Sequence, residues 1–185
     1  MSYENDIAKI LVSEEEIAGA VKRIAKQMEE DFKDSDKKVL FLCTLKGAVV
    51  FLADLMKNFN LPAELDFIKV SSYASGTESS GVISLKSGPD LTDLSNYNVV
   101  VIEDILDTGN TLSWLLNHIK TNMNADCVKL CTLFNKPDRR KKEVNVDYQG
   151  FIIPVEFIVG YGLDYNEMYR NLPYVGVLKP EVYNK

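Results

Sequence analysis

The residues best suited to chemistry lie at positions 99–111, in the segment VVVIEDILDTGNT. Its uninterrupted apolar start, VVVI, predicts a central strand that is buried on both faces. Three acids follow within five positions, Glu103, Asp104 and Asp107, and a glycine then precedes an amphipathic stretch typical of a helix. Because ligands of parallel sheets bind beyond the carboxyl ends of the strands, we interpret this segment as an anion-binding site.

The turn that we expect at 103–110 would present backbone N–H groups at the positive end of the dipole of the next helix. With threonine hydroxyls beside them, these donors suit a phosphate. Glu103 and Asp104 are too close for a second phosphate, so we expect them to bind vicinal sugar hydroxyls or a divalent cation. This combination suits a ribose 5-phosphate, and the alternative is that the acids are solvated turn and helix-start charges. The candidate phosphate-binding residues are Asp107, Thr108, Gly109, Asn110 and Thr111.

Other common sites lack their required residues. There is no Gly-x-x-x-x-Gly-Lys-Ser/Thr phosphate loop, and the Gly-Tyr-Gly at 160–162 fails as a dinucleotide fingerprint because Tyr165 replaces the third glycine. His118 is expected on a helix surface or in helix packing rather than in a triad or a metal site. The three cysteines show no Cys-x-x-Cys spacing, and Cys127 and Cys131 are expected on one strand face in the core.

Length and composition favour a single domain over residues 1–185. The chain is 46% hydrophobic and 26% charged, as in soluble globular proteins, and its net charge of −6 argues against nucleic acid as a partner. Uncharged apolar residues nowhere approach the 18 or so needed to span a bilayer, and the first residues do not have a secretory signal pattern. We therefore expect a cytoplasmic protein without a membrane partner.

The elements that position the acidic segment alternate between strands and helices. Ser13 and Glu16 form a capping box, which predicts a helix start with an apolar stripe from Ile17 to Met28. Alternating elements predict an α/β fold with a mostly parallel twisted sheet flanked by helices. The polar run at 71–81 is expected to be a mobile lid or an inert loop. Strands are predicted at 39–43, 65–70, 82–86, 99–102, 127–134 and 156–162, with further helices around 51–59 and 112–119.

The segment VVVIEDILDTGNT resembles the phosphoribosyl diphosphate signature of the type I phosphoribosyltransferases. Roughly residues 10–180 are similar to the hypoxanthine-guanine phosphoribosyltransferases in particular. This resemblance implies a small hood built from the N-terminal segment and about 150–185, beside a flexible loop at about 71–81. The further matches are LKG at 45–47, SSY at 71–73, the lysine of LFNKP, and FIVGYGLDYNEMYRNLP at 157–173.

The resemblance also implies roles for individual residues toward phosphoribosyl diphosphate. Lys46 and Gly47 correspond to a loop that contacts pyrophosphate, with a cis peptide bond before the lysine, and Arg170 is a further pyrophosphate contact. Ser72 and Tyr73 begin the loop that closes over the reacting centre. The implied binding residues for phosphoribosyl diphosphate or nucleotide are Lys46, Gly47, Ser72, Tyr73, Glu103, Asp104, Ile105, Asp107, Thr108, Gly109, Asn110, Thr111 and Arg170.

For the purine, the resemblance implies that Asp107 is the catalytic general acid/base near N7 and that Lys136 donates to the exocyclic oxygen. Phe157 would stack on the ring, and the backbone of Ile158 would contact the ring edge. Without the resemblance, Lys136 reads as a solvated loop lysine, Phe157 as a core aromatic, and Arg170 as an oligomer contact; the basic run at 139–142 is expected to be solvated surface. The implied Mg²⁺ residues are Glu103, Asp104 and Asp164, the last grouped with the purine-binding residues.

The implied activity is Mg²⁺-dependent transfer of a 5-phosphoribosyl group from phosphoribosyl diphosphate to N9 of hypoxanthine or guanine. A homodimer or homotetramer is expected from the family. The alternatives are a regulator of the same fold that senses phosphoribosyl diphosphate and binds RNA or DNA, or an enzyme that prefers xanthine or a pyrimidine. Asn110 and Glu156 depart from residues common among relatives, which leaves phosphate affinity and the choice of 6-oxopurine open.

Overall fold

The computed structural model of the chain describes residues 3–72 and 83–184. A six-stranded sheet has the order β4-β3-β2-β5-β6-β7, and every neighbouring pair is parallel except β3 and β4. The predicted α/β fold with a mostly parallel sheet is therefore confirmed. The strands are β2 (Lys38–Thr44), β3 (Ala63–Ser72), β4 (Ile83–Ser87), β5 (Tyr97–Leu106), β6 (Cys127–Asn135) and β7 (Tyr148–Ile152).

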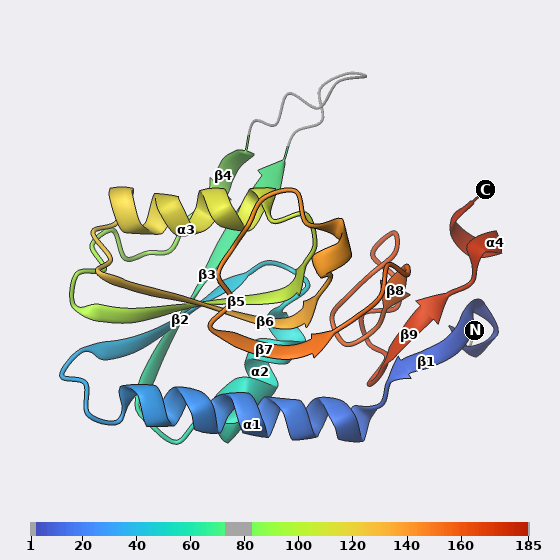
Figure 1. Cartoon of the computed structure of the whole chain (residues 1–185), viewed down its shortest axis with the longest axis horizontal. Helices are drawn as coiled ribbons and strands as arrows, with labels where there is room; N and C mark the ends of the chain where they lie inside the picture. Colours follow the sequence, from blue (N-terminus) through green and yellow to red (C-terminus); the bar gives the residue numbers. More distant parts are fainter. Residues whose placement is uncertain (1–2, 73–82, 185) are drawn as a thin grey trace.

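Helices cover both faces of this sheet (Figure 1). On one face α1 (Glu14–Phe32) and α2 (Val49–Asn58) enclose one hydrophobic core, and on the other face α3 (Asn110–Asn122) encloses a second. The capping box is confirmed, since the Ser13 N–H donates to Glu16 Oε2 at 2.8 Å and the Glu16 N–H donates to Ser13 Oγ at 3.2 Å. Val99 to Ile102 in β5 are fully buried, as their uninterrupted apolar run predicted.

The two chain ends form a small second sheet beside the main one, the predicted hood (Figure 1). Strand β9 (Val175–Leu178) lies between β1 (Ile7–Val12) and β8 (Ile158–Val159), and both pairs are antiparallel. A short 3-10 helix, Tyr3–Asp6, precedes β1, and α4 (Pro180–Tyr183) follows β9. The hood has its own apolar cluster around Val159, Tyr169 and Leu178.

Two predicted boundaries were wrong. Strand β5 continues to Leu106, so Glu103 and Asp104 belong to the strand rather than to a turn, and Glu103 pairs with Thr132 of β6. The strand predicted at 156–162 is only β8, because Gly160, Tyr161 and Gly162 have φ values of +101°, +49° and +97° that end the extended run. Strands β1, β7 and β9, α4 and a 3-10 helix at Pro137–Arg139 were not predicted.

His118 and Cys131, for which we expect no chemical role, take part in the packing of the protein. His118 is half-buried on α3 and stacks on Trp114, with 5.0 Å between ring centroids, as helix packing would require. Cys131 is buried as predicted, whereas Cys127 is only half-buried, so that part of the prediction was wrong. Among the helices of residues 3–72 and 83–184, none combines the length and the apolar character needed to cross a membrane.

Candidate functional site

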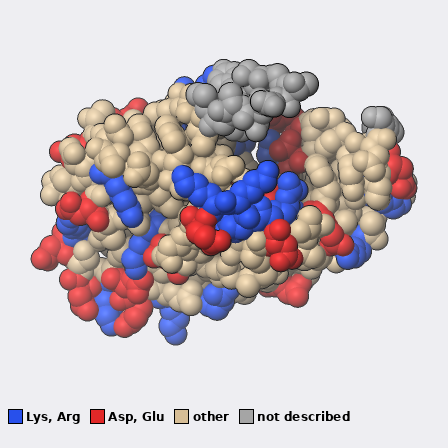
Figure 2. Space-filling view, turned by 45° about the horizontal axis from the view of Figure 1, so that its top comes forward, with Lys and Arg blue, Asp and Glu red and all other residues tan. Residues whose placement is uncertain are grey.

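A cavity of about 430 Å³ opens between the carboxyl end of β5 and the hood. In Figure 2 a hollow separates the hood from the rest of the molecule, with charged side chains on its rim. Seven of the residues predicted from sequence line this cavity: Asp104, Ile105, Asp107, Lys136, Phe157, Ile158 and Asp164. Five further lining residues were not predicted: Arg139, Val155, Glu156, Leu163 and Tyr183.

A smaller hollow of about 200 Å³ lies at the turn between β5 and α3. Gly109 is the N-cap of α3 and has a φ of +82°, so the backbone reverses at a residue that tolerates this conformation. The N–H groups of the first helical turn have no partner within the helix and are available for an anion. Asn110 is exposed and does not line this hollow. Its lining residues are Glu103, Ile105, Leu106, Asp107, Thr108, Gly109, Thr111 and Leu112.

The two hollows adjoin, because Ile105 and Asp107 line both of them. One molecule with an anionic end and a flat end could therefore occupy both at once. Asp107 lies at the junction, and its buried Oδ1 atom has no hydrogen-bond partner within residues 3–72 and 83–184. Arg139 Nε lies 3.0 Å from this oxygen, which makes an ion pair but not the angle of a hydrogen bond. The Asp107 carboxylate therefore keeps an acceptor position for a ligand.

Arg139, Lys141 and Lys142 of the basic segment 139–142 are exposed, as expected of a solvated surface, but the backbone of this segment and the half-buried Arg140 also pack on the turn. The N–H groups of Lys141 and Lys142 both donate to the Thr108 carbonyl, at 2.9 and 3.0 Å. Arg140 Nε donates to the Asp107 carbonyl at 3.0 Å. A Cβ atom on Gly109 would lie 2.2 Å from the Lys142 carbonyl oxygen, so this close approach requires glycine. Sequence could not indicate this contact, because it joins segments about thirty residues apart that only the fold brings together.

Lys136 is buried, with 6% of its surface exposed. The interpretation of Lys136 as a solvated loop lysine, made without the family resemblance, was therefore wrong. Its Nζ atom donates to the carbonyl of Glu156 at 2.7 Å. Desolvation lowers the pKa of Lys136, while the negative charge of Asp107 opposes that change. An ammonium with further donor capacity thus lines the same cavity as the Asp107 acceptor.

Glu103 and Asp104 bring two carboxylates together at the end of β5. Burial and the adjacent charge of Asp104 raise the pKa of Glu103 well above its ordinary value. A divalent cation would relieve this repulsion, and carboxylate oxygens are ligands that Mg²⁺ accepts. Within residues 3–72 and 83–184, no three acidic, histidine or cysteine side chains cluster as a closed metal site. The two carboxylates of Glu103 and Asp104 are thus candidate oxygen ligands for a divalent cation.

The loop at 45–47 packs against these acids. The Leu45–Lys46 peptide bond is cis, as the family resemblance implied. A Cβ atom on Gly47 would lie 1.6 Å from Asp104 Oδ2, so only glycine leaves room for this carboxylate. On another side, a Cβ atom on Gly162 would lie 2.1 Å from the Gly47 carbonyl oxygen. The 45–47 loop thus lies between β5 and the hood, and the missing side chains of Gly47 and Gly162 allow this close approach.

The side chains of Lys46, in this loop, and of Arg170, the further predicted pyrophosphate contact, share one acid. Lys46 Nζ and Arg170 Nη2 approach the two carboxylate oxygens of Glu167 at 3.0 and 3.1 Å. Arg170 also pairs with Asp164 at 2.7 Å and donates to the Gly162 carbonyl at 2.7 Å. Its buried Nε atom has no hydrogen-bond partner among the described residues. Lys46 and Arg170 do not line the 430 Å³ cavity, but Arg170 pairs with Asp164, which does.

The remaining predicted residues lie at the hood and at the end of β3. Phe157 is 39% exposed, so the reading as a core aromatic was wrong, whereas Ile158 is buried in β8. Ser72 ends β3, where its backbone pairs with Ile83. Tyr73 and nearly all of the 71–81 loop lie outside the described residues.

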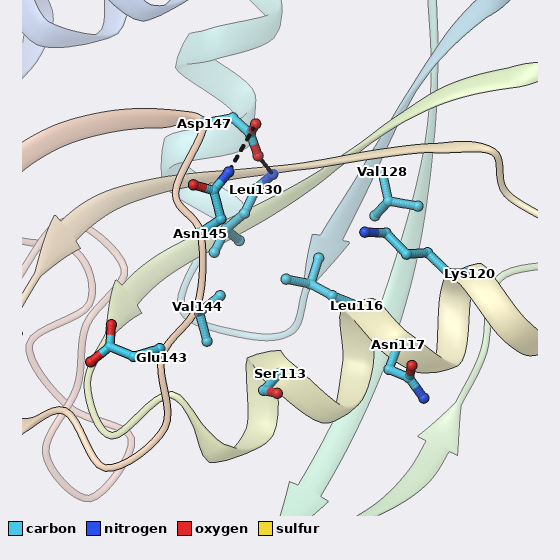
Figure 3. Close-up of a pocket in the computed structure, with 10 residues that line it drawn as sticks. All are labelled: Ser113, Leu116, Asn117, Lys120, Val128, Leu130, Glu143, Val144, Asn145 and Asp147. Carbon is cyan, nitrogen blue, oxygen red and sulfur yellow. Dashed lines mark hydrogen bonds between the residues drawn. The ribbon is translucent and has the colours of Figure 1, made fainter.

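A separate hollow of about 290 Å³ lies between α3, β6 and the segment 143–147 (Figure 3). It contains none of the predicted site residues. Figure 3 shows Asp147 on its wall, where the carboxylate accepts hydrogen bonds from the Leu130 N–H at 2.8 Å and from Asn145 at 3.3 Å. These partners satisfy the acid within the protein, in contrast to Asp107.

Comparisons with known proteins agree on one family. Residues 8–166 match the phosphoribosyl transferase domain. The chain is 48% identical over 182 residues to a hypoxanthine-guanine phosphoribosyltransferase of Streptococcus thermophilus, covering 98% of this chain and 99% of that protein. A crystal structure of a hypoxanthine phosphoribosyltransferase from Staphylococcus aureus matches with a TM-score of 0.91 and 40% identity, covering 98% of this chain and 97% of that one. A hypoxanthine-guanine phosphoribosyltransferase of Bacillus anthracis matches with a TM-score of 0.86 and 41% identity, covering 94% and 99% of the two chains.

Proposed function

This chain belongs to the phosphoribosyl transferase family, and from that premise we propose that it transfers a 5-phosphoribosyl group from phosphoribosyl diphosphate to N9 of hypoxanthine or guanine. The products are the purine nucleotide and pyrophosphate. The observation that carries the proposal is the adjoining pair of hollows, one suited to a phosphate and the other to a flat base, that meet at Ile105 and Asp107.

The 5-phosphate occupies the hollow at the turn. Backbone N–H groups of residues 108–111 and the hydroxyls of Thr108 and Thr111 donate to its oxygens, at the positive end of α3. The neighbouring Glu103 and Asp104 accept hydrogen bonds from the ribose hydroxyls or hold a cation that those hydroxyls share. The sugar thereby lies with its C1 atom toward the larger cavity.

The base occupies the larger cavity. Its ring stacks on Phe157, and the ammonium of Lys136 donates to the exocyclic oxygen. A cation at this point favours an acceptor on the base, as hypoxanthine and guanine have, over the amino group of adenine. The backbone of Ile158 contacts the opposite ring edge, and Asp107 accepts the proton that the base loses.

The reaction breaks the bond between C1 and the pyrophosphate oxygen and forms the bond between C1 and N9. Positive charge develops on the sugar, and negative charge develops on the leaving oxygens. The backbone of the 45–47 loop and the guanidinium of Arg170 bind those oxygens. Asp107 takes the proton of the base through Oδ1, the carboxylate oxygen that has no hydrogen-bond partner among the described residues. Closure of the loop at 71–81 is proposed to exclude water from C1.

Magnesium fits this site, and Glu103, Asp104 and Asp164 are its proposed contacts, shared with substrate or water. When bound, the ion would neutralise charge on the pyrophosphate and polarise its oxygens. We also propose that the protein is a cytoplasmic homodimer or homotetramer, a proposal that rests on the family resemblance and that analytical ultracentrifugation would test.

The experiment is to mix the protein with Mg²⁺, phosphoribosyl diphosphate and each purine in turn, and to follow nucleotide formation by absorbance. We expect a nucleotide with hypoxanthine or guanine, and none with adenine. Asp107→Asn should lower kcat by about 10²- to 10⁴-fold, because the proton acceptor is lost, and should leave the KM for phosphoribosyl diphosphate nearly unchanged. Wild-type turnover in this variant would contradict the role of Asp107, and product with xanthine alone would reassign the substrate.

A further inference from the structure

The ring of Phe157 has two faces, and one of them is already covered by a second aromatic ring. Tyr183 lies nearly parallel to Phe157, with 4.8 Å between ring centroids and 20° between planes. Tyr165 meets the same ring edge-on, at 5.6 Å and 87°. A centroid separation of 4.8 Å leaves no space for a third ring between Phe157 and Tyr183.

Phe157 nevertheless remains 39% exposed, so its accessible surface belongs to the face opposite Tyr183 and to its rim. Both aromatic residues line the 430 Å³ cavity, together with Ile105 from the end of β5. A purine can therefore stack only on the free face of Phe157 unless Tyr183 leaves its place.

The backbone fixes the position of Tyr183 relative to Phe157. The Leu178 N–H donates to the Phe157 carbonyl at 2.9 Å, next to the pairing of β8 with β9. Lys179 is bound at both its N–H and its Nζ atom to carbonyls of Asp6 and Asn5, at 2.9 and 2.7 Å. The short helix α4 then brings Tyr183 back over the ring only four residues later.

We propose that Tyr183 is a positioning residue for the purine base: its ring backs Phe157 and fixes the plane on which the base stacks. This inference rests on the proposed function and deepens it, since it assigns to the C-terminal segment a part in base affinity. Without the backing ring, Phe157 would keep only its edge-on contact with Tyr165, so its ring would be less restrained and the base would have to order it on binding.

The test compares Tyr183→Ala, Tyr183→Phe and Val182→Ala. Val182 packs on the same hood cluster as Tyr183 but does not line the cavity. Val182→Ala therefore reproduces the loss of hood packing in Tyr183→Ala without the loss of an aromatic ring at the cavity. We expect Tyr183→Ala to raise the KM for hypoxanthine by about 2- to 12-fold, the range of an aromatic pair, with kcat and the KM for phosphoribosyl diphosphate changed less than about twofold. Tyr183→Phe retains the stack and should behave as wild type, as should Val182→Ala.

Three results would overturn the proposal. A lower KM for hypoxanthine in Tyr183→Ala would mean that Tyr183 occupies the place of the base. Equal effects of Tyr183→Ala and Val182→Ala, or failure of Tyr183→Phe to restore the KM, would mean that the ring has no specific role.

Calorimetric titration with inosine monophosphate separates this inference from the proposed function. If the wild type binds the nucleotide but forms none from base and donor, the proposed reaction fails, while weaker binding by Tyr183→Ala alone still supports the stack. If the wild type forms nucleotide and all variants bind inosine monophosphate equally, the stack has no role and only the inference fails.

Discussion

The turn at 103–111 and the hood residues at 156–183 build opposite sides of one site by different means. The turn offers backbone groups, positioned by β5 and α3 and held by hydrogen bonds from the 139–142 segment to Asp107 and Thr108. The hood offers side chains, on a segment where four residues other than glycine have positive φ, from Tyr161 to Tyr169.

This difference predicts which substitutions the phosphate-binding and base-binding sides of the site can tolerate. A phosphate bound by N–H groups depends on the path of the chain, so the turn is sensitive where that path requires glycine. A base bound by Lys136, after β6, and by Phe157 of the hood depends on side-chain identity, so substitutions at these two residues should alter affinity for the base while the fold persists. The predictions below test this contrast.

The largest effect is expected from Gly109→Ala. The new methyl group would meet the Lys142 carbonyl at 2.2 Å in a residue with φ of +82°, so the turn must distort. We expect a loss of about 1–3 kcal/mol in the free energy of unfolding and at least a tenfold rise in the KM for phosphoribosyl diphosphate. Urea denaturation and steady-state kinetics measure these quantities.

Gly19→Ala is the matched control, because no atom of the described part of the chain lies within 4 Å of the added methyl group on α1. It should stabilise the protein by about 0.5–1 kcal/mol and leave kinetics unchanged. Wild-type stability and donor KM in Gly109→Ala would contradict the backbone account of the turn.

A more selective effect, confined to the base and without loss of stability, is expected from Lys136→Met. Loss of a hydrogen bond from a charged group should raise the KM for hypoxanthine by about 10- to 150-fold, with the KM for phosphoribosyl diphosphate nearly unchanged. Lys141→Met, at an exposed residue of the neighbouring segment, is the control.

The pH profile sharpens this test. Desolvation lowers the pKa of Lys136, so the wild-type enzyme should lose base affinity as pH rises through a value below the ordinary 10.5. Ionisation of the base itself affects both enzymes equally, so only the difference between wild type and Lys136→Met reports the lysine. Identical profiles would remove Lys136 from base recognition.

The smallest effect is expected from Glu167→Gln. Glu167 pairs with Lys46 of the 45–47 loop and with Arg170, at 3.0 and 3.1 Å, and these hydrogen bonds lower its pKa. Removal of its charge should free them and lower the KM for phosphoribosyl diphosphate by about twofold, a small change because the pair is exposed. A raised KM, measured against unchanged base kinetics, would mean that Glu167 supports donor binding.

The same contrast explains what the sequence could predict. The turn was found from residue types alone, because a buried apolar strand, acids and a glycine before a helix are local features. The boundary error at Glu103 and Asp104 arose because pairing with β6 extends β5 beyond its apolar run. The hood was found only through family resemblance. Strand β8 has only two residues, and the positive φ values in the segment that follows it, Gly160 to Tyr169, fit no local sequence rule.

Arg139 and Tyr183 were missed as cavity residues for a related reason. Arg139 belongs to a basic run typical of solvated surface, and Tyr183 lies almost at the chain end. Their contacts with Asp107 and Phe157 join residues far apart in sequence, which no local pattern indicates.

A crystal structure with inosine monophosphate tests the central claim most directly. The account predicts the phosphate within hydrogen-bond distance of the N–H groups of residues 108–111, and the purine ring on Phe157 with its oxygen at Lys136. A phosphate in the hollow between α3 and β6, or a ring that leaves Phe157 and Lys136 without contact, would contradict it.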